Sequence, residues 1–260
     1  MSNKIQSLWI GGSLGKMEQL SAKSFIDHGH TYHLYTYGKV ENIPEGVIVK
    51  DGNEIVSKSE IFRYKNGSLS AFSNYFRFHM LHMKGGYWAD TDLICTKPFQ
   101  FKQDYVFISE PTRDYKNNIP TSCLIKMPKN SLVTAEAIKI QKEHKKLILS
   151  GRLTWSSGPK TVQMIIETFF LHRYILQYKT VCSCHYSHIL SLLNPSYKPN
   201  PNIVNSINDI PEKMVAIHLW NEVWRRRGYD KNRTYHPDSL YEQLKRKHFK
   251  KKTSESLLNI

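Results

Sequence analysis

Strand-like and helix-like apolar segments alternate along the first half of this chain, and this alternation constrains the fold more than any other feature. Short apolar runs over residues 5–10, 32–37 and 47–49 predict strands, whereas residues 17–28 and 69–84 carry apolar side chains at helical spacing. Strands that alternate with helices favour a parallel sheet with crossover helices. We therefore expect an α/β fold: a single Rossmann-like domain whose central, mostly parallel sheet has helices on both faces.

The second half of the chain continues with further strands and helices. The proline- and asparagine-rich stretch 194–211 favours a long loop. The remaining elements are predicted as strands at 106–108, 123–125 and 214–219 and helices at 132–149 and 159–174.

The size and composition of the chain suit one large domain. Its 260 residues are 40% hydrophobic, which is enough for a substantial core. No apolar run approaches the roughly 20 residues of a bilayer span, and residues 1–10 lack the profile of a secretion signal. We therefore expect a cytoplasmic protein, one that could also lie at a membrane surface.

The four cysteines do not predict a disulfide framework at this chain length. Cys182 and Cys184, with His185 and His188 close by, could suggest zinc. Their spacing fits no common structural zinc site, and no second cysteine pair completes one. An ordinary strand end is therefore favoured over zinc for this segment.

An acidic pair, Asp90 and Asp92, follows the predicted helix 69–84 and its terminating Gly85-Gly86. Carboxylates two residues apart on an extended strand point to the same side. Two like charges at close range repel each other unless a cation lies between them. Mg²⁺ and Mn²⁺ prefer such oxygen ligands, together with water and a phosphate-bearing substrate. The pair therefore predicts a divalent-cation site, with an acidic turn as the plainer alternative.

Four separated segments carry a resemblance to a known family. They are Trp9-Ile10-Gly11-Gly12, Ser73-Asn74-Tyr75-Phe76-Arg77, the Asp90/Asp92 pair and His218-Leu219-Trp220-Asn221. Together they resemble the GT-A-fold glycosyltransferases whose sugar-binding region carries a DXD motif. Relatives of this kind include yeast-type initiating mannosyltransferases, α-1,4-galactosyl- and N-acetylglucosaminyltransferases, capsule transferases and clostridial glycosylating toxins. The resemblance covers about residues 1–225 and implies a GT-A-like fold.

The resemblance also implies roles for individual residues. It makes Asp90, Asp92 and Arg77 catalytic, and it places Asp92, Asp90 and His218 on Mn²⁺ or Mg²⁺. Asn74 departs from the family pattern, which has Asp there, although its amide can still bond a sugar hydroxyl. The implied donor-binding residues are Trp9, Ile10, Gly11, Ser73, Asn74, Arg77, Trp88, Asp90, Trp220 and Asn221.

The reaction implied by the resemblance is transfer of a sugar from a nucleotide diphosphate sugar to a hydroxyl of a glycan or lipid-linked acceptor. The segment at Trp9 matches the uridine-binding toxins most closely, so a UDP-sugar is favoured over a GDP-sugar. The family's transferases of this type retain the α-configuration, and no covalent nucleophile stands out in the sequence. Glu110 could act as a base or contact the acceptor, although a strand-end turn residue is the more ordinary interpretation.

The chain is strongly basic, with a formal net charge of +15. Residues 225–252 hold 11 Lys and Arg against 3 Asp and Glu. We therefore separate a catalytic domain at 1–228 from a basic helix or tail at 229–260, in which Leu240, Leu244 and His248 share one face. Such a helix could lie on an anionic membrane, or it could pack on the catalytic domain with its lysines in water.

Two other classes of function compete with glycosyl transfer. A non-catalytic basic module could bind nucleic acid or an anionic membrane. The sequence lacks RNP-like aromatics, zinc fingers and a helix-turn-helix pattern, so no nucleic acid is expected. A different Mg²⁺-dependent phosphate enzyme is disfavoured, because the chain has no Gly-rich phosphate loop ending in Lys-Ser/Thr.

Overall fold

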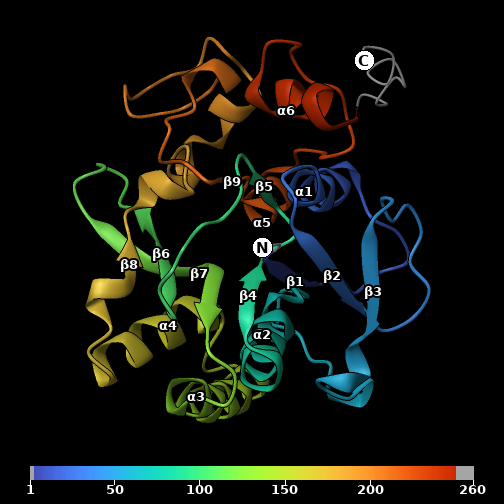
Figure 1. Cartoon of the computed structure of the whole chain (residues 1–260), viewed down its shortest axis with the longest axis vertical. Coiled ribbons are helices and arrows are strands. Elements are labelled where there is room, and N and C mark those ends of the chain that lie inside the picture. The colour runs from blue at the N-terminus through green and yellow to red at the C-terminus, as the bar shows by residue number, and fades with distance from the viewer. Residues whose placement is uncertain (1–2, 250–260) are drawn as a thin grey trace, which may run out of the picture.

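The computed structural model describes residues 3–249 and shows a central sheet with helices on both faces (Figure 1). The strands of this sheet are β1 (Lys4–Leu8), β2 (Thr31–Thr36), β3 (Val47–Asp51), β4 (Gly86–Ala89), β6 (Val106–Pro111), β7 (Asn118–Met127) and β8 (Ile175–Leu176). Within the described residues they lie in the order β3-β2-β1-β4-β7-β6-β8. β7 runs antiparallel to both of its neighbours, and the other adjacent pairs are parallel. The predicted α/β fold with a mostly parallel sheet is confirmed.

A second, two-stranded sheet lies beside the central one. It consists of β5 (Leu93–Cys95) and β9 (Ala216–His218), which run antiparallel with Leu93 opposite His218. This pairing joins segments that are far apart in the sequence. It therefore brings the acidic pair next to the histidine that the sequence analysis singled out.

Helices cover both faces of the central sheet (Figure 1). α2, α3 and α4 pack on one face, whereas α1 and the second sheet pack on the other. The α-helices are α1 (Lys16–Asp27), α2 (Ser70–Lys84), α3 (Leu132–Leu149), α4 (Ser157–Thr168), α5 (Asn221–Arg227) and α6 (Leu240–Phe249). The 3₁₀ turns are η1 (Gly52–Glu54), η2 (Lys58–Glu60), η3 (His172–Tyr174), η4 (Tyr178–Thr180), η5 (Tyr186–Leu192) and η6 (Ile207–Asp209).

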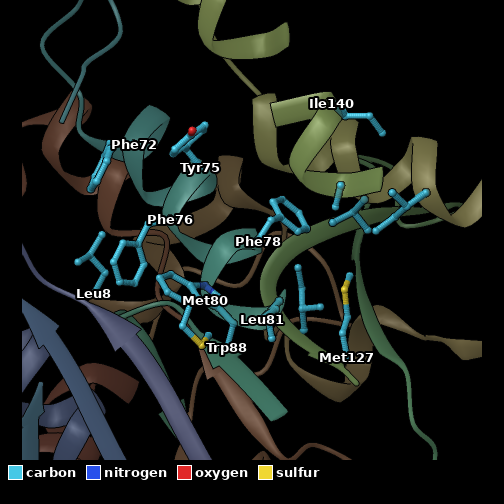
Figure 2. Packing of buried hydrophobic residues seen from close by; sticks show 14 of the residues in the cluster. Leu8, Phe72, Tyr75, Phe76, Phe78, Met80, Leu81, Trp88, Met127 and Ile140 are labelled. Carbon is cyan, nitrogen blue, oxygen red and sulfur yellow. The ribbon is translucent and has the colours of Figure 1, made fainter. Parts of the chain in front are cut away.

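Helix α2 forms the core of one side of the sheet (Figure 2). Its apolar residues recur at helical spacing, so Phe72, Phe76 and Met80 fall on a buried face. The Phe76 ring lies 6.3 Å from the Trp88 ring of β4, centroid to centroid. This contact fixes β4, and with it the start of the acidic pair, against the helix.

Successive side chains of β4 point to opposite faces of the sheet, so that the strand contributes to the core on each face. Trp88 belongs to the cluster around α2. Tyr87 and Ala89 belong to the cluster on the other face, together with Phe25 of α1. β4 is therefore held between two cores at the point where the acidic pair follows it.

Two helices differ from the sequence-based prediction. The helix predicted at 159–174 spans Ser157–Thr168, and the chain turns away at Phe170, whose backbone has a φ of +55°. Helix α5 has no counterpart in the prediction, because its seven residues are too few to show a helical period. The stretch 194–211 is irregular, as predicted, apart from η6.

Helix α6 packs on the body of the protein. Leu240, Tyr241 and Leu244 are buried, and the helix contacts α1. The apolar stripe is therefore covered by the protein itself, which is the second of the two alternatives drawn from the sequence, and this stripe is not left for a membrane. The basic run 250–252 lies outside the described residues, and the boundary after residue 228 stays a prediction. In residues 3–249, no helix is both long and apolar enough to cross a bilayer.

Candidate active site

The acidic pair lies in a turn between the two sheets. The Leu93 N–H donates to Asp90 O (3.2 Å), which closes the turn, and the Asp90 N–H donates to Cys123 O of β7 (2.8 Å). The expected extended strand across the pair is therefore wrong, because the chain leaves the central sheet after Ala89 and enters β5 at Leu93. The turn still gathers the two carboxylates with His218: one ligand atom from each residue lies within 4.8 Å of the others.

Gly85 sets the direction in which the chain enters β4. Helix α2 ends with the Gly85 N–H donating to Leu81 O (2.9 Å), and Gly85 has φ +64° and ψ −170°. This backbone conformation is essentially restricted to glycine. A Cβ atom here would lie 2.7 Å from Lys129 N. The glycine before the acidic pair is therefore required by the backbone.

Asp90, Asp92 and His218 form the one group of at least three potential metal-ligating side chains found within residues 3–249. His218 Nε2 lies 3.5 Å from Asp92 Oδ2. The Asn221 N–H donates to the same oxygen (2.8 Å). Asp92 Oδ1 is buried and has no hydrogen-bond partner in the described chain, so it can accept a cation.

Arg77 reaches the acidic pair from α2. Its Nη2 donates to Asp90 Oδ1 (2.5 Å), and Trp88 Nε1 donates to the same oxygen (2.7 Å). The guanidinium lies 4.9 Å from the Trp88 ring centroid. Arg77 is only 2% exposed, yet Nε and Nη1 have no partner among the described residues. Two buried nitrogens of a cation, which carry three N–H groups between them, are therefore available to an anionic ligand.

The pKa values in this group reflect its coupled charges. Burial works against ionisation of Asp92, but His218 and the Asn221 N–H outweigh it and lower the pKa of Asp92. Burial raises the pKa of Asp90. The charge of Arg77 partly offsets this increase, whereas the charge of Asp92 raises the pKa further. Burial lowers the pKa of His218, but Asp92 and then Asp90 outweigh it, so that this pKa is raised. A proton on His218 thus partly neutralises a pair of carboxylates that a divalent cation could neutralise instead.

Trp9 follows β1 and lines a cavity of about 430 Å³ together with Lys231 and Asn232. The Lys231 ammonium lies 5.2 Å from the Trp9 ring centroid. Trp9 Nε1 is buried without a partner in residues 3–249. Gly11 approaches the ring so closely that a Cβ would lie 3.1 Å from Nε1. Ile10 instead packs against the core around α2.

Ser73 and Asn74 lie on α2, one turn before Arg77. Asn74 Nδ2 donates to Ser157 Oγ at the start of α4 (3.0 Å). A Cβ on Gly158 would meet the Asn74 side chain, so Asn74 ties two helices together. Ser73 is half-buried, and its side chain makes no hydrogen bond to the described part of the chain.

Trp220 and Asn221 lie where α5 begins, beside the metal-ligand group. Trp220 has a φ of +59°, which is unusual for a bulky side chain. Its ring lies 4.0 Å from the His218 ring, centroid to centroid. Trp220 Nε1 is buried without a partner in residues 3–249. Asn221 approaches Asp92 through its backbone N–H.

The remaining sequence candidates lie at the edge of the site or outside it. Glu110 on β6 is half-buried, and burial raises its pKa, although the charge of His218 opposes the shift. The segment around Cys182 and Cys184 is irregular and buried, so the predicted strand end is wrong. In the described residues it contributes to no group of metal-ligating side chains.

Sequence patterns did not single out three further side chains near the site. The Arg226 guanidinium lies 5.7 Å from the Trp155 ring centroid, and Lys231 closes the cavity at Trp9. The available signals were the arginine run 225–227 directly after the His-Leu-Trp-Asn segment and the tryptophan just before Ser156-Ser157-Gly158-Pro159. Because these residues come from separate segments, their contacts appear only in the folded chain.

Comparison with known proteins gives no match to a family model and none to a curated protein. Solved structures with a similar backbone include the PaToxG glycosyltransferase, at 14% identity and a TM-score of 0.48 over 65% of this chain and 70% of that one. The glycosyltransferase GlyE of Streptococcus pneumoniae TIGR4 has 14% identity and a TM-score of 0.46 over 95% and 63% of the two chains. The UDP-bound glycosyltransferase domain of the YGT toxin has 13% identity and a TM-score of 0.43 over 93% and 81%. These values describe a distant likeness, and no residue role rests on them.

Proposed function

We propose that this chain is a metal-dependent glycosyltransferase that moves a sugar from a nucleotide diphosphate sugar to a hydroxyl group. One observation carries the proposal: buried polar atoms that have no partner among the described residues gather around the acidic pair. They are Asp92 Oδ1, Arg77 Nε and Nη1, His218 Nδ1 and Trp220 Nε1. Buried polar groups are normally paired, so both an acceptor for a cation and donors for an anion are left open at one site.

The residues present fit a small divalent cation. Asp92, Asp90 and His218 would hold it, with the free Asp92 Oδ1 as the most direct ligand. Two carboxylates and an imidazole suit Mn²⁺, and Mg²⁺ also accepts the carboxylates. When bound, the cation would neutralise the charge of the nucleotide diphosphate as it leaves.

The protein groups around the cation suit the anionic part of the donor. Arg77 is fixed by Asp90 and Trp88, so Nε and Nη1, which have no partner in residues 3–249, are preorganised toward a phosphate or sugar oxygen. The Trp220 indole, next to His218, offers a further N–H that has no partner in residues 3–249. Asn74 is a weaker candidate for a sugar contact than the family resemblance implies, because its amide already bonds Ser157.

A UDP-sugar is the donor we favour. The cavity at Trp9 combines an aromatic ring with Lys231 and Asn232, a lining that suits a flat polar base next to a phosphate. Calorimetric titration with UDP and with GDP in Mn²⁺ tests this choice. We expect tighter UDP binding that weakens in Trp9→Ala, and tighter GDP binding would overturn the choice.

We also propose that the reaction retains the α-configuration. No Asp or Glu among the described residues has the place of an obvious covalent nucleophile, so same-face attack is favoured, with the leaving phosphate taking the acceptor's proton. An early-time NMR measurement of the anomeric proton in the product tests this. A β-linked product would instead point to Glu110 as a base.

The central experiment is a panel of nucleotide sugars incubated with the full chain and Mn²⁺. We expect hydrolysis of at least one UDP-sugar, as transferases of this kind also pass the sugar to water, and loss of this activity in EDTA. Turnover that is unaffected by EDTA, or no turnover and no nucleotide binding with any member of the panel, would reject the proposed function.

A further inference from the structure

A row of ring side chains leads from the metal-ligand group to the hairpin between β6 and β7. Starting at His218, successive ring centroids are 4.0, 6.0, 4.0, 6.2 and 5.9 Å apart. Rings whose centroids lie within about 7 Å of each other can interact as aromatic pairs. We call this set the aromatic row; it consists of His218, Trp220, Tyr186, His185, His188 and Tyr115.

Tyr186 is the exposed member of the aromatic row. It is 45% exposed, whereas His185 and Trp220 on either side of it are buried. The neighbouring side chains hold the row together: Tyr115 OH accepts the His185 N–H (3.0 Å) and lies 3.0 Å from His188 Nδ1. The row therefore offers a fixed, partly uncovered ring directly beside the proposed donor site.

Two arginines from different elements border the aromatic row. Arg227 of α5 donates from Nη1 to Ser187 O (3.1 Å), and Arg113 lies in the β6–β7 hairpin. Burial is the main cause that lowers the pKa of His188, and the charges of Arg113 and Arg227 both add to it. Both arginines are exposed. Their charges therefore act on the His188 ring and are also accessible to a ligand from solvent.

The carboxylates on these two elements already have partners. Asp114 accepts hydrogen bonds from the Thr112 hydroxyl and the Lys116 N–H. Glu222 forms a two-point ion pair with Arg225. The charge of Arg113 and Arg227 is therefore left for a ligand.

We propose that the aromatic row is the acceptor subsite and that it takes an anionic glycan. A sugar ring lies against Tyr186, and a carboxylate or phosphate on the glycan lies between Arg113 and Arg227. An aromatic face suits the apolar face of a sugar ring, and guanidinium groups suit carboxylate and phosphate equally well. The role of the glycan as acceptor rests on the proposed glycosyl transfer, whereas binding of the anionic glycan does not.

The test measures binding of oligosaccharides to the full chain by calorimetry, without metal or nucleotide. The probes are hexagalacturonate, a mannose oligosaccharide carrying 6-phosphate, and the neutral maltohexaose. We expect at least one anionic probe to bind about tenfold or more tightly than maltohexaose. The better of the two anionic probes identifies the charged group as carboxylate or phosphate.

Matched variants separate a built subsite from general attraction to a basic protein. Arg113→Ala and Arg227→Ala should each weaken the anionic probe by about fivefold or more. Lys142→Ala removes the same charge from the exposed side of α3 and should change little. Tyr186→Ala should also weaken binding, whereas Tyr186→Phe keeps the ring and should bind like the original chain.

Three results would overturn the proposal: equal binding of neutral and anionic probes, arginine variants that lose no more than Lys142→Ala, or a folded Tyr186→Ala that binds normally. Circular dichroism of each variant identifies any that fail to fold. Because metal and nucleotide are absent from this assay, a failure of the proposed donor chemistry would appear only in the hydrolysis panel. The two proposals can therefore fail separately.

Discussion

At the scale of single residues, the carboxylate of Asp92 connects the candidate cation site with His218 and with the start of α5. Its Oδ2 accepts the Asn221 N–H and faces His218, while its Oδ1 has no hydrogen-bond partner in residues 3–249. One side chain therefore has both a structural and a ligand-binding oxygen. A substitution that keeps the shape but removes the charge separates the two tasks.

We predict that Asp92→Asn lowers Mn²⁺-dependent hydrolysis of the UDP-sugar by at least about a hundredfold, because a neutral amide is a poor ligand for a hard cation. The Asn221 contact can be kept by the amide oxygen, so the thermal midpoint should stay close to that of the original chain. Asp104→Asn, an exposed carboxylate on a loop, is the control and should retain activity. Full activity of Asp92→Asn would contradict the metal assignment.

Glu18 and Lys231 form a second residue-scale feature, at the cavity beside Trp9. The Glu18 side chain is 1% exposed and lies 2.5 Å from Lys231 Nζ. Burial raises the pKa of Glu18 above 4.5, although Lys231 opposes the shift. Since the unfolded chain ionises at lower pH than the folded one, Glu18 contributes less to stability as the pH rises above that value.

We predict that Lys231→Met raises the pKa of Glu18 further and leaves a buried carboxylate without its cation. The free energy of unfolding should fall by about 3 kcal/mol near neutral pH, and by less at about pH 5, where Glu18 is more readily protonated. Urea unfolding at the two pH values measures both losses. In the double variant Glu18→Gln/Lys231→Met, the loss in the free energy of unfolding should be the same at both pH values. A loss of equal size at both pH values in Lys231→Met alone would contradict the prediction.

At the scale of elements, the junction between α2 and β4 places the acidic pair. We predict that Gly85→Ala destabilises the chain by several kcal/mol, because the added Cβ would lie 2.7 Å from a backbone nitrogen in a conformation that disfavours side chains. Gly67→Ala is the matched control: its φ is +80°, but nothing lies within 4 Å of the added atom, so it should cost only about 1 kcal/mol. Chemical denaturation of both variants gives the comparison, and equal losses would show that the clash is relieved without cost.

The long periodic elements were accessible from the sequence, because helix α2 and strands β1 and β2 carry apolar residues at the spacing of their own faces. The short ones were not: α5 has seven residues, and its position depends on the Asp92 carboxylate. The convergence of Asp90, Asp92 and His218 was expected only through family resemblance, since it depends on the pairing of β5 with β9. The aromatic row had no sequence signal, because its members come from three separate segments.

At the scale of the whole molecule, the segment after α5 is part of the core. Trp224 of α5 lies 4.9 Å from the Tyr241 ring of α6, centroid to centroid. We predict that a chain ending at Asp230 does not fold stably, since each buried apolar side chain removed from α6 costs about 2–5 kcal/mol out of a total of about 5–15 kcal/mol. Thermal unfolding followed by circular dichroism compares this chain with the full one. A stable chain ending at Asp230 would instead support the separate tail predicted from composition.

The bond from the Asn221 N–H to Asp92 has a thermodynamic consequence for the whole site. The same carboxylate that can ligate the cation also holds the first turn of α5, and Arg227 of the acceptor subsite is the last residue of that short helix. This bond gives the cation site and the arginine a direct structural connection. If loading the metal and donor changes the affinity for the anionic acceptor by some factor, linkage requires the acceptor to change donor affinity by that same factor. The order in which donor and acceptor bind would then depend on their concentrations in the cell. The free energy that couples the two binding events would depend on the Asn221–Asp92 hydrogen bond and on the two turns of α5.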